Sequence, residues 1–274
     1  MKKILVTGCS GYIGQHLCKV LEKEYVVGLD RVFTPVMADK FVMQDITSGF
    51  DHYGHYDTVI HLAALVNVNQ SMITPMSYYK TNVTGTLKVL ENISFDNFIF
   101  ASTGAAENPC SPYALSKASV ESLIRQYCLM NNKDYTIFRF YNVTGSAGFK
   151  PTNWDGLLYN LMKARETGEF NLYGNDYDTI DGTAERDYVH VLEVCNAIKM
   201  AVQKPSNLLV ENLGTGVGHT VQQIVDKFKL VNECDFKINY LPRRYGDMAK
   251  SVLKNVSPYM QKSFTIEEML RVPK

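Results

Sequence analysis

The sequence has no surplus of charge, no long apolar run and no paired cysteine motif, and each absence narrows the range of functions. Basic and acidic side chains number 28 each in 274 residues, so charge gives no case for binding nucleic acid or an anionic membrane. No apolar run approaches the roughly 18 residues needed to span a bilayer. The six cysteines form no CxxC pair, which argues against a zinc site and against a disulfide framework. We therefore expect no metal, no nucleic acid and no membrane among the partners.

The first residues and the scattered cysteines favour a cytoplasmic protein. The apolar stretch that opens the chain ends at Thr7-Gly8, which is too short for the core of a signal peptide. Unpaired cysteines suit a reducing compartment. The composition, 46% hydrophobic and 20% charged, is ordinary for a folded chain, and the length allows one large domain or two smaller ones.

Apolar strands alternate with helical segments over the first half of the chain. Strands are expected at 4–7, 25–29, 40–43, 58–62, 97–101 and 135–140, and helices at 12–24, 75–92 and 112–131. Continuously apolar strands of this kind are typical of a parallel sheet with helices on both faces. The sequence therefore predicts an α/β fold, a doubly wound parallel-sheet Rossmann domain over residues 1–146, with ligands at the carboxyl ends of the strands.

Turn residues become frequent after Gly145, which predicts a smaller, loop-rich C-terminal lobe over residues 147–274. A helix is expected near residues 189–203. The alternation of strands and helices also allows this helix to pack against the first domain. Residues 255–274 are expected to form a short closing helix.

The glycine turn after the first strand predicts a dinucleotide site. Gly8, Gly11 and Gly14 follow the strand, and a helix follows them. Glycines allow the tight turn and the close approach of the backbone to phosphate, and the helix directs N–H groups at the anion. The alternative interpretation is that the three glycines only form a turn and bind no cofactor. Asp30 ends the second strand, where a carboxylate binds ribose hydroxyls and repels a 2′-phosphate, so NAD is favoured over NADP although Arg31 follows.

Tyr113 and Lys117 form a candidate catalytic pair. Residues at positions i and i+4 share one helix face, so the ammonium can lie near the phenol and favour the phenolate. A lowered tyrosine pKa would suit a base that acts near neutral pH. The preceding strand ends at Ser102-Thr103, which supplies a hydroxyl for the oxygen of a substrate. An ordinary pair on a helix surface is the alternative interpretation.

Several segments resemble the extended short-chain dehydrogenase/reductase family, and within it the UDP-glucose 4-epimerases. The resemblance covers nearly the whole chain. Its most specific segments lie in the second half, which general dinucleotide enzymes do not share. The segments are Val6–Gly14, Asp57–Ala64, Asn82–Thr86, Ser111–Lys117, Arg139–Val143, Tyr173–Tyr177, Asp181–Thr183, Arg186–His190 and Pro242–Asp247.

The resemblance implies roles for individual residues. Tyr113 is the base and acid at the sugar 4-hydroxyl, tuned by Lys117, and Thr103, with Ser102 beside it, is the catalytic hydroxyl. The implied cofactor residues are Gly8, Gly11, Tyr12, Ile13, Gly14, Asp30, Arg31, Asp45, Ile46, Leu62, Ala63, Ala64, Asn82, Lys117 and Tyr141. The implied substrate residues are Asn142, Asn153, Tyr173, Arg186, Arg244 and Asp247. The planar guanidinium groups of Arg186 and Arg244 suit phosphate binding. The alternative interpretation is that they form structural salt bridges.

The implied reaction is the NAD-dependent 4-epimerisation of a UDP-hexose through a 4-keto sugar. The resemblance also implies a homodimer that pairs the helices at 75–92 and 112–131, with the alternative that their apolar residues face the sheet; these residues are Leu87, Leu90, Leu123, Ile124 and Tyr127.

The sequence departs from the family in a loop shortened to residues 104–110 and in a short C-terminus. Ser251 falls where some members carry a bulky tyrosine, so N-acetylated sugars are also considered as substrates. A nucleotide-sugar 4,6-dehydratase or decarboxylase, a reductase and a catalytically silent NAD-binding protein remain the alternatives. The dehydratases and decarboxylases place a carboxylate after the catalytic threonine, where this chain has Gly104 and Ala105.

Overall fold

The chain folds into two units that interleave in the sequence. The computed structural model describes residues 1–48, 54–149, 156–205, 209–244, 246–261 and 263–272. Unit 1 comprises Met1–Phe140 and Cys195–Glu211, and unit 2 comprises Tyr141–Val194 and Asn212–Lys274. The division therefore falls a few residues before the expected boundary at residue 146, and a later segment of the chain adds to unit 1.

Unit 1 is built on a seven-stranded sheet with the order β10-β6-β5-β4-β1-β2-β3. The pairings β1·β2, β1·β4, β2·β3, β4·β5 and β5·β6 are all parallel. The sequence did not predict β10, in which Glu211 and Asn212 interrupt the apolar pattern. The strands are β1 Lys3–Thr7, β2 Tyr25–Asp30, β3 Lys40–Met43, β4 His55–His61, β5 Ser94–Thr103, β6 Asp134–Phe140 and β10 Leu209–Leu213.

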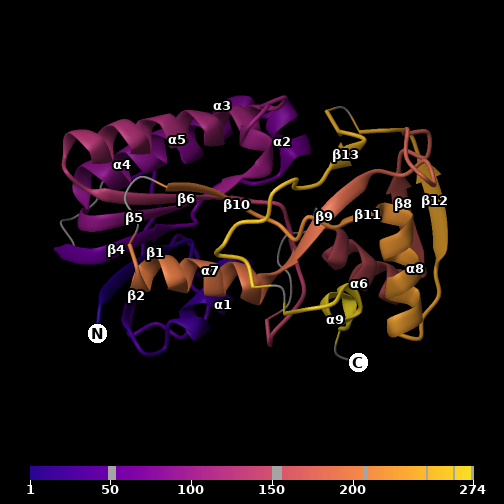
Figure 1. Cartoon of the computed structure of the whole chain (residues 1–274), viewed down its shortest axis with the longest axis horizontal. Helices are drawn as coiled ribbons and strands as arrows, with labels where there is room; N and C mark the ends of the chain where they lie inside the picture. Colours follow the sequence, from indigo (N-terminus) through magenta and orange to yellow (C-terminus); the bar gives the residue numbers. More distant parts are fainter. Residues whose placement is uncertain (49–53, 150–155, 206–208, 245, 262, 273–274) are drawn as a thin grey trace. The chain divides into compact units, whose positions relative to one another are not determined.

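Helices cover both faces of this sheet, as Figure 1 shows, with α2 to α5 on one side and α1 and α7 on the other. The last two are neighbours, because Lys199 Nζ donates to Val20 O at 3.2 Å. The predicted doubly wound sheet is therefore confirmed. The helices are α1 Tyr12–Val20, α2 Val68–Ile73, α3 Pro75–Tyr78, the π-helix η1 Tyr79–Thr84, α4 Gly85–Asn92, the 3-10 helix η2 Gly104–Ala106, α5 Pro112–Met130 and α7 Val191–Gln203.

The largest apolar core of unit 1 joins α4 and α5 to the sheet. Phe98 and Phe100 of β5 are buried there with Leu90 of α4 and Ile124 of α5. Tyr127 packs against the same core and donates its hydroxyl to Leu90 O at 2.7 Å. Leu90, Ile124 and Tyr127 thus pack towards the sheet, while Leu87 and Leu123 are half-buried.

Unit 2 contains two small sheets and its own apolar core. Strand β9 is the centre of the larger sheet and pairs with β7, β11 and β13, while β8 pairs with β12. The expected closing helix is limited to α9. The elements are β7 Asn142–Thr144, α6 Leu157–Thr167, β8 Glu169–Tyr173, β9 Glu185–His190, β11 Gly218–Thr220, α8 Val221–Val231, β12 Lys237–Leu241, β13 Lys250–Ser251 and α9 Ile266–Leu270.

A buried carboxylate in β9 organises the loops of unit 2. Asp187 is fully buried and accepts the N–H and the hydroxyl of Thr215, at 2.8 and 2.7 Å. It also accepts the N–H groups of Gly216 and Leu253, at 2.8 and 3.3 Å. Several N–H donors on one carboxylate compensate for the loss of its hydration.

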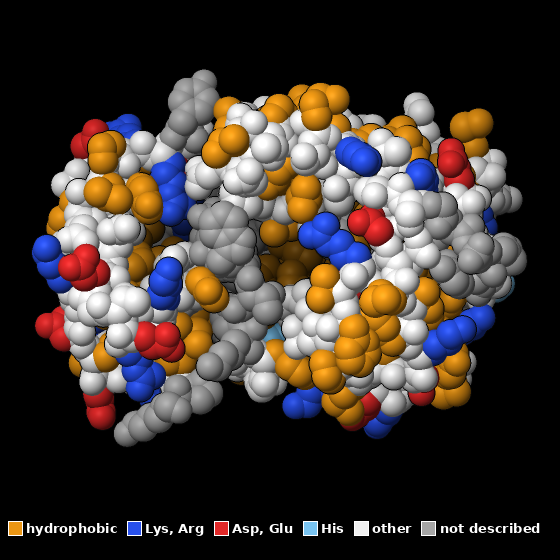
Figure 2. Space-filling view, turned by 180° about the vertical axis from the view of Figure 1, so that it is seen from behind, with side chains coloured by type: hydrophobic (Ala, Val, Ile, Leu, Met, Phe, Trp, Pro, Cys, Tyr) orange, Lys and Arg blue, Asp and Glu red, His pale blue; other side chains and the backbone are white. Residues whose placement is uncertain are grey.

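Charges of both signs are interspersed over the face drawn in Figure 2, as the balanced composition predicts. No helix within the described ranges is both long and apolar enough to cross a membrane.

His61, at the end of β4, is a buried neutral histidine. Its Nδ1 lies 2.7 Å from Thr7 Oγ1 and its Nε2 lies 2.9 Å from Thr86 Oγ1. Burial, with a smaller contribution from the charge of Lys117, lowers the pKa of His61 from 6.5 to about 3. The folded state therefore excludes a proton that the unfolded chain binds below pH 6.5.

We predict that burial of neutral His61 makes the protein less stable at low pH. Its contribution to the free energy of unfolding should be fully present above pH 6.5 and be lost as the pH falls towards 3. The loss approaches about 1.4 kcal/mol per pH unit in this window. The free energy of unfolding, measured by urea denaturation, should change less between pH 7 and pH 5 for His61→Gln than for the wild type. His55→Gln, at a half-exposed imidazole, is the matched control. Equal differences for His61→Gln and the wild type would contradict this account.

Candidate active site

The turn between β1 and α1 has the geometry of a phosphate cradle. Gly8 has φ +75°, and a Cβ placed there would lie 2.7 Å from Ala63 N. A Cβ at Gly14 would lie 2.2 Å from Gly8 O, so only glycine lets α1 begin so close to the turn. A Cβ at Gly11 would meet only Gly8 O, at 3.2 Å, and α1 begins at Tyr12 without a side-chain cap. A turn without side chains at these glycines and a helix start without a side-chain cap fit a pyrophosphate.

Asp30 stands beside this turn at the end of β2. Its Oδ2 accepts the N–H of Ser10 at 3.0 Å and its Oδ1 accepts that of Val32 at 3.2 Å. The carboxylate is thus fixed in direction at the carboxyl end of a strand, where the sequence predicts a ribose contact. Arg31, which follows it, is exposed.

The residues expected near the adenine follow β3. Asp45 accepts the N–H of Thr47 at 2.7 Å, and this hydrogen bond is the main cause that lowers the pKa of Asp45. Ile46 is buried in the core of unit 1, where its side chain occupies the space beside Gly85. The backbone around Asp45 is therefore anchored by both polar and apolar contacts.

Three residues expected to line the cofactor groove follow β4 directly. The N–H of Leu62 donates to Thr7 O at 3.1 Å, which continues the pairing of β4 with β1. Ala63 lies against Gly8, and both Ala63 and Ala64 are half-buried. The structure thus brings this segment to the glycine turn, as the sequence predicts for the carboxyl edge of the sheet.

Asn82 joins the loop after β4 to α5, the helix that carries Tyr113 and Lys117. It accepts the N–H of Leu65 at 2.8 Å and donates to Leu65 O and Ser116 Oγ, at 3.0 and 2.9 Å. The hydroxyl of Ser116 in turn donates to Tyr113 O at 2.7 Å. Asn82 lies in the π-helix η1, and π-helical turns are frequent at functional sites. The sequence predicted one regular helix here and missed both Ser116 and the π-turn.

Tyr113 lies in the first turn of α5, close to the end of β5. Ser111 caps the helix by accepting the N–H of Ala114 at 3.2 Å, and Pro112 occupies the first turn. The Thr103 side chain lies near the Tyr113 phenol, where it acts to lower the pKa of Tyr113. Two of the predicted catalytic side chains are therefore neighbours.

The expected fall in the pKa of Tyr113 is wrong for the protein alone. Burial raises this pKa to about 12, and the neighbouring Thr103 hydroxyl opposes the rise only in part. The sequence shows the nearby lysine but not the depth of the phenol, which is only 9% exposed. Desolvation thus outweighs any attraction by a cation of the chain.

Lys117 is buried one turn further along α5. Its ammonium donates to Ala101 O at 2.7 Å and lies 4.5 Å from the centre of the Phe100 ring. Burial lowers the pKa of Lys117 to about 7, and the carboxylate of Glu121 acts in the opposite direction. The sequence predicted Lys117 but missed Glu121, although an acidic residue four positions further along the same helix was visible.

Ser102 has a different environment from that of Thr103. It is 3% exposed, and its hydroxyl donates to Glu121 Oε1 at 2.5 Å. The neighbouring Thr103 side chain contacts Tyr113 instead. Of the two hydroxyls at the end of β5, Thr103 therefore lies with the phenol and Ser102 with the buried carboxylate.

Unit 2 gathers four of the predicted substrate residues. The guanidinium of Arg244 lies 3.9 Å from the centre of the Tyr173 ring. Arg186 lies 3.6 Å from the carboxylate of Asp247, whose N–H donates to Arg244 O at 3.3 Å. Arg186 therefore does form an ion pair, and its partner is itself a predicted ribose contact. An arginine stacked on a tyrosine is suited to recognition of a nucleotide.

The remaining predicted residues of this lobe begin unit 2. Tyr141 donates its N–H to Leu213 O at 3.0 Å, and the amide of Asn142 donates to Asp187 O at 3.2 Å. Asn153 lies outside the described residues.

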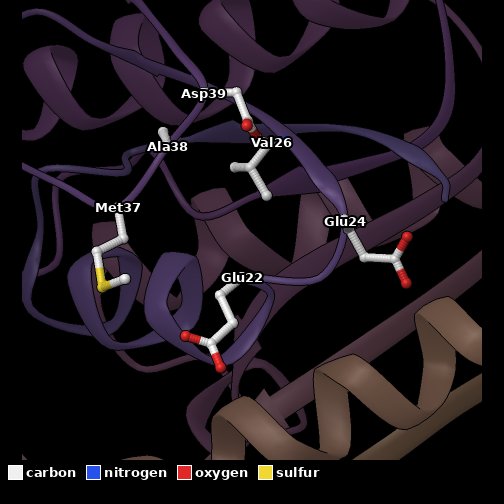
Figure 3. Close-up of a pocket in the computed structure, with 6 residues that line it drawn as sticks. All are labelled: Glu22, Glu24, Val26, Met37, Ala38 and Asp39. Carbon is white, nitrogen blue, oxygen red and sulfur yellow. Dashed lines mark hydrogen bonds between the residues drawn. The ribbon is translucent and has the colours of Figure 1, made fainter.

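A small surface pocket of unit 1 lies away from this chemistry (Figure 3). Its lining residues are Glu22, Glu24, Val26, Met37, Ala38 and Asp39. Two of its carboxylates already serve the backbone, because Glu24 accepts Lys2 N at 2.6 Å and Asp39 accepts Val26 N at 2.7 Å. The pocket is at the start of β2, whereas ligands of such sheets bind at the carboxyl ends.

Across the described ranges, no group of three His, Cys, Asp or Glu side chains could hold a metal ion.

Comparisons with known proteins identify the family of the chain. Residues 4–214 match the sequence model of the NAD dependent epimerase/dehydratase family. A UDP-glucose 4-epimerase of Lactobacillus helveticus is 32% identical, over 89% of this chain and 86% of its own. The crystal structure of a UDP-glucose 4-epimerase from Stenotrophomonas maltophila, with bound NAD and formylated UDP-arabinopyranose, is 26% identical with a TM-score of 0.87, over 98% of this chain and 96% of its own. A UDP-Glc/GlcNAc 4-epimerase from Campylobacter jejuni is 27% identical with a TM-score of 0.81, over 98% and 97%. The chain therefore belongs to the NAD-dependent epimerase/dehydratase family.

Proposed function

We propose that the protein catalyses the NAD-dependent 4-epimerisation of a UDP-hexose, such as UDP-glucose and UDP-galactose. The observation that carries the proposal is that Thr103, at the end of β5, lies near the phenol of Tyr113, with Lys117 one turn away on the same helix. The glycine turn supports NAD as the cofactor, since the absence of side chains at Gly8, Gly11 and Gly14 lets phosphate approach the backbone. The relatives and solved structures named above are themselves UDP-sugar 4-epimerases.

The residues of unit 1 have distinct tasks in this reaction. NAD, when bound, supplies an acceptor for the C4 hydride and a positive charge that favours the phenolate. Thr103 orients the 4-hydroxyl of the sugar, and Tyr113 takes its proton. Once the flat 4-keto sugar has turned and presents its opposite face, Tyr113 would return the proton to the oxygen at C4. Lys117 stabilises the phenolate through its charge.

Unit 2 is proposed to hold the nucleotide part of the substrate. The Tyr173 ring, with Arg244 stacked on it, suits the planar uracil and the diphosphate. Arg186 suits the diphosphate, and Asp247, its present partner, suits ribose hydroxyls. Asn142 and Asn153 are retained as proposed substrate contacts, and Tyr141 as a proposed cofactor contact.

The rival chemistry of a 4,6-dehydratase has less support. Gly104 and Ala105 follow Thr103 where a dehydratase needs a carboxylate. Glu107 is exposed and lies 3.4 Å from Arg139, so it is already paired. A reductase would need cofactor exchange, whereas epimerisation needs no net oxidant or reductant.

We also infer that the protein works in the cytoplasm as a homodimer. All six cysteines are free, which suits a reducing compartment. The half-buried Leu87 and Leu123, with the exposed Leu115, Leu129 and Met130 of α5, are apolar side chains that could pair α4 and α5 of two copies.

Replacing Tyr113 by phenylalanine should lower kcat by about 10²–10⁴-fold, because the group that moves the proton is lost. The rate of conversion of UDP-glucose to UDP-galactose, followed by NMR, measures this effect. Tyr127→Phe is the matched control, since it removes a hydroxyl from the same helix at a site where the hydroxyl donates only to Leu90 O. Equal rates for the two variants would exclude Tyr113 as the base.

Gly11→Ala should weaken NAD binding by about tenfold or more, because the new methyl enters the space left for the pyrophosphate. Calorimetric titration of the NAD-free protein measures the affinity. Gly168→Ala is the control, since it adds a methyl in open space at the end of α6 and should change stability but not affinity. Wild-type affinity in Gly11→Ala would place the cofactor elsewhere.

The small side chain of Ser251 predicts that UDP-N-acetylhexosamines also react. Ser251 of β13 is half-buried and pairs with Arg186, a proposed phosphate contact. Ser251→Tyr should therefore reduce kcat/KM for UDP-N-acetylglucosamine far more than for UDP-glucose. A wild-type protein that converts only the plain sugar would reject this prediction.

A further inference from the structure

A buried carboxylate joins three elements behind the catalytic residues. Glu121 of α5 is 3% exposed. Its Oε1 accepts the hydroxyl of Ser102 at 2.5 Å and the Nε of Arg139 at 2.9 Å, and its Oε2 accepts the Nη2 of Arg139 at 2.8 Å. The carboxylate thus connects α5 with the ends of β5 and β6. A two-point bond between guanidinium and carboxylate fixes orientation as well as distance.

Two neighbours of this carboxylate connect it to proposed catalytic groups. Ser102 precedes Thr103, so the bond from Ser102 holds the strand end that carries the Thr103 hydroxyl. Glu121 lies four residues after Lys117, on the same helix face. Lys117 is itself 3% exposed, so the charge of a neighbouring carboxylate acts on it with little screening by water.

We propose that Glu121 is a positioning residue for the reaction proposed above. Its carboxylate supplies the negative charge that compensates the buried ammonium of Lys117, and it anchors the end of β5, with Thr103, to the helix that carries Tyr113. Glu121 itself contacts no reacting atom. Arg139 of β6 holds the Glu121 carboxylate in place.

The charged groups around Glu121 and Lys117 come from several elements. Lys117 faces Glu121 on α5 and the neutral His61 on β4, and it donates to the backbone of β5. Glu121 faces Arg139 on β6 and also Arg125 on α5, whose Nη2 lies 3.6 Å from Oε2. Arg139 reaches Glu107 at 3.4 Å. Burial lowers the pKa of Lys117 to about 7 and Glu121 opposes this, so removal of the Glu121 charge must lower the pKa further.

The test is a titration of Lys117 in Glu121→Gln. Lysines labelled with ¹³C at Cε are followed by NMR in the full protein, and the Lys117 signal is assigned with Lys117→Arg. We expect its pKa to fall by about one unit or more, as loss of a close opposite charge requires. The alkaline limb of the kcat/KM profile should move to lower pH by the same amount. An unchanged pKa overturns the proposal.

The control is Glu107→Gln, which removes the exposed carboxylate on the other side of Arg139 and should leave the pKa and the rate unchanged. The NMR titration needs no substrate, so a protein that fails to epimerise UDP-hexoses leaves this inference testable while refuting the proposed function.

Ser102→Ala tests the anchoring role even if Glu121→Gln does not fold. Because the charge of Glu121 remains, the pKa of Lys117 should stay within a few tenths of a unit. A looser strand end should lower kcat by several-fold with little change in KM. A wild-type kcat would overturn the anchoring role, and so would a loss above about 10²-fold, which is the size expected for a group that acts on the substrate directly.

Discussion

The approach of the Thr103 side chain to the Tyr113 phenol is the contact on which the proposed chemistry depends. It joins the first turn of α5 to the end of β5, so a slip of either element would separate the two groups. The parallel sheet makes this contact possible because it brings strand ends and helix starts to one edge. The Ser111 cap, the Asn82 amide and the Glu121 carboxylate each fix α5 from a different side.

Burial determines the electrostatics of this edge more than pairwise attraction does. It raises the pKa of Tyr113 to about 12 and lowers that of Lys117 to about 7, so the protein alone favours a neutral phenol and a weakened ammonium. Charges brought by the cofactor or held by Glu121 therefore have large effects here, because little water screens them. The site is thus prepared to respond to a bound cation rather than to ionise by itself.

Sequence patterns predicted most of unit 1 because they are local. Strand β3 was predicted with its observed bounds, and the glycine turn, Asp30 and the Tyr113–Lys117 pair lie at the predicted edge of the sheet. The π-turn around Asn82 and strand β10 were missed, since both depend on contacts with distant segments. The same reason hid the bond of Glu121 with Arg139 of β6, and it hid the burial that reverses the expected pKa shift of Tyr113. In unit 2, the pairing of Arg186 with Asp247 could not be read from either segment alone.

The central claim is that hydride leaves the sugar C4 and returns to it without exchange with water, while Tyr113 moves only the hydroxyl proton. Incubation of the protein with UDP-glucose in D₂O, with no added reductant, tests this most directly by NMR of the product sugar. The account predicts UDP-galactose with protium at every carbon. Deuterium at a sugar carbon, loss of water from the sugar or the absence of any product would contradict it.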